Sequence, residues 1–129
     1  MQPVMHPAAM NGAFAQAFNS GQLENLLALY EDDALLCTDD ASRIITGKAE
    51  IARMLTPLLA LQGTMTSRNV FCLATGDIAL LRAEWHIEDD TGHRIAAGSS
   101  AEVCRRQPDG TWRYLIDHAV GASLPGTPA

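Results

Sequence analysis

One acidic side chain that could do chemistry is Glu102, which lies in a run of small and apolar residues. On a strand, Glu102 shares its face with Ser100 and Cys104, while Ala101 and Val103 point to the opposite face. If the first face looks into a cavity, Glu102 is a carboxyl group in apolar surroundings with a raised pKa. If it does not, Glu102 is an ordinary surface glutamate. The first alternative makes Glu102 a candidate general base.

A second candidate is the adjacent pair Asp117 and His118. Consecutive side chains on a strand point to opposite faces, so these two cannot hydrogen-bond as a catalytic base and the group that orients it. Regular alternation places His118 on the face of Tyr114 and Asp117 on the face of Leu115. His118 is then either a hydrogen-bonded histidine near the end of the sheet or a catalytic proton donor.

Metal and cofactor sites find little support in the sequence. Glu84, His86 and Glu88 alternate onto one strand face, but no third or fourth ligand position is defined elsewhere, and the nearby Arg82 favours ion pairs. The chain has no serine nucleophile elbow, no phosphate-binding glycine loop and no dinucleotide fingerprint. We therefore expect neither a metal nor a cofactor.

The elements that must position these residues are helical in the first half of the chain. Met10, Phe14 and Phe18 recur every four residues, which predicts one apolar stripe on a helix. The same spacing predicts a second helix, and a short apolar run predicts a strand before the polar segment 38–42. The expected elements are helices over 10–18, 23–30 and from Gly47 to near Gly63, and a strand over 34–37.

In the second half the period changes to that of strands. Turn residues at 75–77, 89–92 and 107–110 divide the chain from Thr64 onward into four β segments. The short connections predict antiparallel neighbours. Over 77–88 the apolar face that includes Trp85 should meet the helices, and the charged face should be solvent surface or a dimer interface. This order predicts the α+β class, with helices packed on a curved antiparallel sheet around a cavity.

Composition supports one domain of 129 residues, with flexible ends expected at 1–7 and 123–129. Hydrophobic residues make up 47% of the chain and the net charge is −6, which argues against a nucleic-acid partner. Cys37, Cys72 and Cys104 are widely separated, which favours reduced thiols. No apolar run is long enough to span a membrane, and no signal peptide is evident. We therefore expect a cytoplasmic protein with no membrane partner.

Three motifs, at residues 30–34 (YEDDA), 47–51 (GKAEI) and 105–113 (RRQPDGTWR), together resemble the SnoaL-like branch of the nuclear transport factor 2-like superfamily. This superfamily also contains ketosteroid isomerase. The resemblance runs from about Met10 to His118. It implies a cone-shaped α+β barrel, commonly dimeric through its sheet, with a pocket between the helices and the concave face.

The resemblance also suggests site residues. The isomerase base would fall at Thr38, and the nearest carboxylates, Asp39 and Asp40, follow it. The donor tyrosine of the first helix is replaced by phenylalanine, and the second acid maps near Glu102. These departures argue against steroid-type isomerization but leave Asp39 as a catalytic candidate. Related chains often carry an acid at the position of Asp117, which makes it a candidate pocket or interface residue.

Three hypotheses follow. The first is a homodimeric domain that binds a small, mostly apolar ligand in a pocket. Its predicted lining is Phe14, Phe18, Tyr30, Trp85 and Tyr114, with Glu102 and Asp117 as polar groups. The second is a lyase or isomerase that acts on a small apolar carbonyl compound, with Glu102 or Asp39 as base and Tyr30, Tyr114 or His118 as donor. The third is a structural dimerization module without a ligand.

Overall fold

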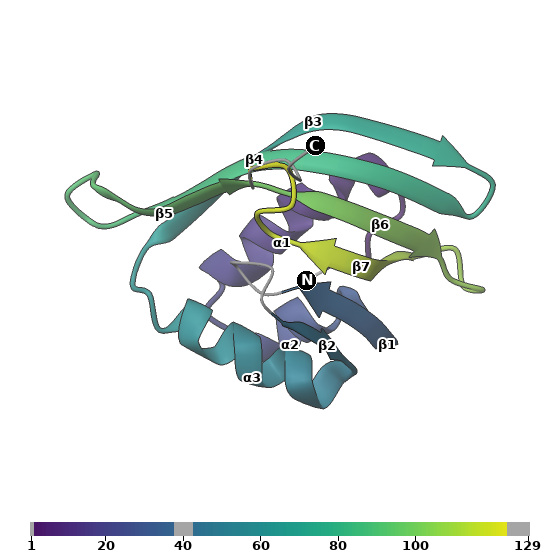
Figure 1. Ribbon diagram of the computed structural model, residues 1–129, viewed down its shortest axis with the longest axis horizontal. Helices are drawn as coiled ribbons and strands as arrows, with labels where there is room; N and C mark the ends of the chain where they lie inside the picture. The colour runs from purple at the N-terminus through teal and green to yellow at the C-terminus, as the bar shows by residue number, and fades with distance from the viewer. Residues whose placement is uncertain (1, 38–42, 124–129) are drawn as a thin grey trace, which may run out of the picture.

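A curved sheet of seven strands, covered by helices on its concave side, forms the structure that the computed structural model describes for residues 2–37 and 43–123 (Figure 1). The helical elements are the 3₁₀ turn η1 (Pro7–Ala9), α1 (Met10–Asn19), α2 (Leu23–Leu27) and α3 (Lys48–Leu59). The strands are β1 (Tyr30–Cys37), β2 (Ile44–Thr46), β3 (Thr64–Thr75), β4 (Ile78–Glu88), β5 (Arg94–Ser99), β6 (Ala101–Arg106) and β7 (Trp112–His118). Among the described residues, no helix is long and apolar enough to cross a membrane.

The strands follow the order β2-β1-β7-β6-β4-β3, and β5 pairs with β4 beyond the end of β6. Neighbours are antiparallel except β1 and β7, which run parallel. In Figure 1 the long strands β3, β4 and β6 arch over α1, with α2 and α3 on the same side. The predicted α+β class, with N-terminal helices on one face of a curved sheet, is confirmed.

The helix α1 is fixed against the sheet at both of its ends. Met10 and Phe18 of its apolar stripe are buried in the core, as the four-residue spacing predicts. At the C-terminal end, the Asn19 side chain accepts a hydrogen bond from the Met65 backbone N–H (2.8 Å) and donates one to the Met65 carbonyl (3.0 Å). Just before the helix, the Val4 carbonyl accepts a hydrogen bond from the Trp112 backbone N–H. This fixed placement turns one face of α1 toward the concave side of the sheet.

Two elements differ from their predicted bounds. The second helix ends at Leu27 rather than near residue 30, because Tyr30 instead begins β1 and pairs with Tyr114 of β7. The third predicted β segment is two strands, β5 and β6, which are separated at Ser100. There the Ser100 hydroxyl accepts a hydrogen bond from the backbone N–H of Ala83 (3.0 Å). In both places tertiary pairing overrides the local pattern.

A β-bulge in β7 changes which side chains face inward. Val103 of β6 pairs with Ile116, but the next residue of β6 pairs with Tyr114, so Leu115 is an extra residue in β7. A bulge of one residue reverses the alternation of side chains beyond it. Tyr114 and Asp117 are therefore both buried, whereas Ile116 is 40% exposed. The prediction that His118 shares the face of Tyr114, and Asp117 that of Leu115, is wrong for this reason.

The outer, convex face of the sheet carries a row of apolar side chains that we call the outer row. Each member lies opposite the next on the neighbouring strand, and together they cross five strands. The row consists of Leu73, Leu80, Val103, Ile116 and Leu35. Leu73 is 64% exposed and Leu80 is 44% exposed. A contiguous set of exposed apolar side chains of this kind is typical of an interaction surface.

Candidate functional site

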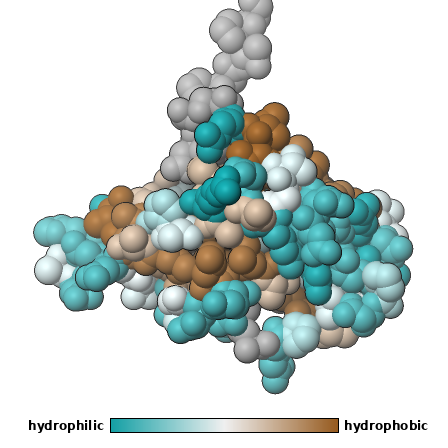
Figure 2. All heavy atoms as spheres, turned by 90° about the horizontal axis from the view of Figure 1, so that it is seen from below, coloured by the Kyte–Doolittle hydropathy of each residue, from teal (hydrophilic) through white to brown (hydrophobic). Residues whose placement is uncertain are grey.

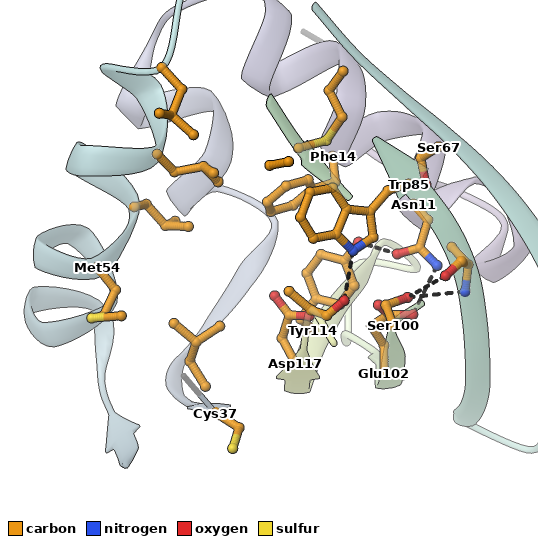
Figure 3. A pocket seen from close by; sticks show the side chains of 18 of the residues that line it. Asn11, Phe14, Cys37, Met54, Ser67, Trp85, Ser100, Glu102, Tyr114 and Asp117 are labelled. Carbon is orange, nitrogen blue, oxygen red and sulfur yellow. Dashed lines mark hydrogen bonds between the residues drawn. The ribbon is translucent and has the colours of Figure 1, made fainter. Parts of the chain in front are cut away.

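A cavity of about 390 Å³ lies between α1, α3 and the concave face of the sheet (Figure 3). One wall comes from the inner face of α3 and consists of Met54, Leu55, Pro57 and Leu58. Phe14 of α1 and Trp85 of β4 contribute aromatic rings. The volume lies within the range of small-molecule sites, which are also mostly apolar with a few polar groups. Figure 2 shows the molecule of Figure 1 from below. In the middle of the face seen there, hydrophobic side chains gather between hydrophilic ones.

The polar end of the pocket contains two carboxyl groups, those of Glu102 and Asp117. The two residues lie directly opposite each other on β6 and β7. Side chains at opposite positions of antiparallel strands are neighbours on the same face. Glu102 is only 4% exposed and Asp117 only 7%, yet both line the cavity. Of the two readings of Glu102 that the sequence allowed, the structure selects the one in which it faces a cavity.

A hydrogen-bond network holds these carboxyl groups in place (Figure 3). The Asn11 amide donates to Glu102 Oε1 (2.9 Å), and its carbonyl oxygen accepts a hydrogen bond from the Tyr114 hydroxyl (2.7 Å). The Tyr30 hydroxyl donates to Asp117 Oδ2 (2.5 Å). Both tyrosine protons are therefore directed to partners within the protein. The Trp85 indole N–H likewise donates to the carbonyl of Ala119 (2.6 Å), away from any ligand.

Burial raises the pKa of both carboxyl groups. For Glu102, burial and then the charge of Asp117 raise the pKa to about 8, against the opposing effects of hydrogen bonds from Ser100 and Asn11. For Asp117, burial raises the pKa to about 6, against the opposing effect of the Tyr30 hydrogen bond. The groups titrate as a pair, and the higher pKa of Glu102 means that one proton stays mainly on it at neutral pH. No lysine, arginine or histidine is among the described residues that line the pocket.

The sequence-predicted residues divide into three groups. The residues of the first group were predicted to line a pocket, and they line the cavity. They are Phe14, Trp85, Tyr114, Glu102 and Asp117. The second group, Phe18, Tyr30 and His118, does not line the cavity, and the third is Asp39, for which the structure gives no description.

Phe18 and Tyr30 are buried in the core and are not among the residues that line the cavity, and Tyr30 is enclosed where β1 pairs with β7. Tyr30 still reaches the site through its hydrogen bond to Asp117. His118 does not line the cavity, because the bulge at Leu115 turns it away with Ile116. Asp39 lies outside the described residues.

The residue that sequence reasoning missed is Asn11, which is 5% exposed and joins α1 to the carboxyl groups. A signal was present, since Asn11, Phe14 and Phe18 have the spacing of one helix face. A polar residue on an apolar face is informative because a buried amide needs hydrogen-bond partners. Cys37 and Met54 also line the pocket, across from the carboxyl groups in Figure 3.

Glu84, His86 and Glu88, which the sequence places on one strand face, lie on the outer face and contact neighbouring side chains there. Glu84 pairs with Arg68 (2.9 Å), and His86 Nε2 lies 3.1 Å from Glu88. Within 2–37 and 43–123, no three histidine, cysteine, aspartate or glutamate side chains gather at one point as a metal site requires.

The profile of the SnoaL-like domain matches residues 12–115, which include Phe14, Glu102 and Tyr114. The chain belongs to the SnoaL-like domain family. No curated protein matches its sequence.

Solved structures similar to this SnoaL-like domain share its fold at low sequence identity. A proposed calcium/calmodulin-dependent protein kinase type II association domain from Thiobacillus denitrificans superposes with a TM-score of 0.78 at 20% identity, over 93% of this chain and 98% of that one. A proposed dehydratase of the NTF2-like family from Streptomyces avermitilis gives 0.70 at 21%, over 92% of each chain. A ketosteroid isomerase-like protein from Erwinia carotovora atroseptica gives 0.70 at 23%, over 89% and 91%. These likenesses establish the NTF2-like fold.

The carboxyl pair should make the stability of this SnoaL-like domain fall as pH rises. Both groups bind protons more tightly in the folded state, so their stabilising effect is complete below their unfolded pKa values and is lost as pH rises through about 6 and about 8. Glu102→Gln removes the contribution of Glu102 while keeping an acceptor for Asn11. Urea unfolding between pH 5 and pH 8.5 should show that this variant gains stability relative to wild type toward high pH.

The matched control is Glu24→Gln, which removes an exposed carboxylate of α2. Its stability profile should run parallel to that of wild type. If the Glu102→Gln profile does the same, Glu102 does not have a raised pKa in the folded protein.

Proposed function

We propose that this SnoaL-like domain binds a small, mostly apolar ligand that carries a few polar groups. The observation that supports this proposal is a 390 Å³ cavity with apolar walls and a buried carboxyl pair at one end. Burying two carboxyl groups costs free energy, and a domain that only needed a core could fill the space with apolar side chains. A polar group kept in an apolar pocket fixes the orientation of a ligand.

Filling the cavity should abolish binding of an apolar probe. Ala96 and Ala97 are neighbours on β5, and Ala96 lines the cavity whereas Ala97 is exposed. Ala96→Leu should weaken binding of the fluorescent probe N-phenyl-1-naphthylamine by about tenfold or more, because the added side chain occupies ligand volume. Ala97→Leu should leave it unchanged. If wild type does not bind the probe, or if both variants behave alike, the pocket is not the binding site and a structural module is favoured.

The proposal includes a homodimer formed through the outer row. The row exposes leucine and isoleucine side chains on the convex face. Arg82 lies two residues from Leu80 on β4 and therefore on the same face. Its Nε is buried and has no hydrogen-bond partner among the described residues. Covering the row would bury the apolar area and could supply the missing acceptor.

A charge in the outer row should dissociate the dimer. Light scattering at micromolar concentration should give about twice the chain mass of 13.9 kDa for wild type. Leu80→Arg should give the monomer mass, because burying an unpaired charge in an interface is costly. Ile44→Arg, which changes a more exposed apolar side chain on β2 outside the row, should remain dimeric. A monomeric wild type would contradict the dimer.

A cytoplasmic location completes the proposal. Cys37, Cys72 and Cys104 are all free thiols. Free thiols at these positions suit a reducing compartment.

A second candidate function is general acid/base catalysis by a lyase or isomerase on a small apolar carbonyl compound. The observation that favours it is the raised pKa of Glu102, which makes its carboxylate a stronger base than an exposed one. The Glu102 carboxylate would take a proton from the carbon beside the carbonyl, and the resulting acid would return a proton to the enolate. Asp117, which accepts a hydrogen bond from Tyr30, lies directly opposite this base.

Such a base should catalyse exchange of hydrogen for deuterium beside the carbonyl of cyclohexanone in D₂O. The exchange rate, measured by proton NMR, should rise with pH through about 8, because only the deprotonated form of Glu102 accepts a proton. Glu102→Gln should lose this exchange, while Glu24→Gln should retain it. A rate equal to that of buffer alone would remove the enzymatic alternative and leave the binding function in place.

A further inference from the structure

The two carboxyl groups at the end of the pocket have acceptor positions that the donors of the described residues do not fill. The protons of Tyr30, Tyr114 and the Trp85 indole are directed to Asp117, Asn11 and the Ala119 carbonyl. Among the described residues, Asp117 receives one side-chain hydrogen bond, although a carboxylate can accept about four. A ligand that satisfies this end must therefore supply donors.

The charge of the pocket end is also unbalanced. Glu102 and Asp117 face each other with no cationic side chain among the described residues that line the cavity. Burial raises the pKa of the other titratable groups near them, so these groups are uncharged at neutral pH. They are Tyr30 of β1, Tyr114 of β7 and Cys104 of β6. The faces of α1 and α3 that line the cavity contribute no charged residue. A buried carboxylate without a partner is costly, so a cation brought by the ligand would be stabilised here.

Aromatic rings stand beside the same carboxyl groups. Trp85, Phe14 and Tyr114 all line the cavity, and the Phe14 and Tyr114 rings pack edge to face with centroids 6.2 Å apart. Figure 3 shows the Trp85 ring beside Tyr114, Asp117 and Glu102. Aromatic faces attract organic cations through their quadrupole, and they do so most strongly where water is excluded. Carboxyl groups and aromatic rings together form a site for an organic ammonium group rather than for a hydrated metal ion.

We propose that the ligand of this pocket is a small apolar amine whose ammonium group binds between Glu102 and Asp117, beside the ring of Trp85. This inference rests on the proposed binding function and specifies its ligand class. An ammonium group has three donors, which allows it to bond both carboxyl groups at once. Its hydrocarbon part would lie along the apolar wall of α3. Because Glu102 binds a proton in the empty pocket at neutral pH, binding of the ammonium group releases that proton to the solvent.

Three probes of the same shape test the ammonium group directly in the wild-type protein. Isothermal titration calorimetry at pH 8 should show benzylamine binding at least about tenfold more tightly than benzyl alcohol, because its hydrogen bonds are charge-assisted. Benzoate should show no binding, since its charge repels the carboxyl pair. Benzylamine affinity should rise from pH 6 to pH 8.5, and titrations in buffers of different ionisation enthalpy should reveal proton release.

Variants assign the effect to the two carboxyl groups. Asp117→Asn and Glu102→Gln should each weaken benzylamine binding by about tenfold or more and leave benzyl alcohol binding within about twofold. The controls Asp90→Asn and Glu24→Gln, which remove exposed carboxylates, should change neither. Equal or tighter binding of benzyl alcohol by wild type, or equal losses for both probes in the variants, would overturn the amine proposal.

The outcomes separate this inference from the function on which it rests. If N-phenyl-1-naphthylamine binds and benzylamine does not, the pocket still binds apolar ligands and the amine class is wrong. If neither probe binds wild type, both proposals fail. The comparison of probes on wild type needs no substitution, so a variant that does not fold leaves the decision unaffected.

Discussion

The site depends on the extra residue that β7 carries at Leu115. Because of this bulge, Tyr114 and Asp117 both face the cavity, although three positions separate them. In a regular strand, Ile116 would take the inward position and the carboxyl group of Asp117 would point outward. The bulge also brings Asp117 opposite Glu102 and within reach of the Tyr30 hydroxyl. The placement of Asp117 beside Glu102 and its hydrogen bond from Tyr30 both follow from one irregularity in one strand.

The carboxyl pair opposes the stability of the domain rather than supporting it. Two buried acids repel each other when both are ionised, and each loses its hydration. The hydrogen bonds from Asn11 and Tyr30 offset part of this cost, and protonation of Glu102 at neutral pH removes one of the two charges. Natural sequences keep such conflicts between local chemistry and global packing mainly where function requires them. Burial of the two carboxyl groups lowers the stability of the domain. Function is therefore expected at this end of the pocket rather than among the surface ion pairs.

The sequence predicted the elements in which apolar residues recur at a regular spacing. The stripe of α1 and the alternation of β4 fixed which faces of these elements are buried, and the three family motifs identified the fold. Alternation alone could not decide whether Glu102 faces inward, because both faces of β6 carry small or apolar residues. The bulge could not be predicted for a similar reason. Leu115 and Ile116 are both apolar, so either residue could face inward without breaking the apolar pattern of the strand. Tyr30 was assigned to a helix because its pairing with β7 joins segments far apart in the chain.

The two faces of β6 and β7 link the proposed pocket to the proposed dimer. Val103 and Ile116, which lie opposite each other in the outer row, directly follow Glu102 and precede Asp117 in the sequence. The backbone that holds the carboxyl pair is therefore the backbone that presents the centre of the outer row. A partner packed on that row would restrict the separation and twist of these two strands, and with them the distance between the carboxyl groups. An ammonium group that bonds both groups needs that distance to be fixed, so a preorganised sheet would reduce the entropy cost of binding.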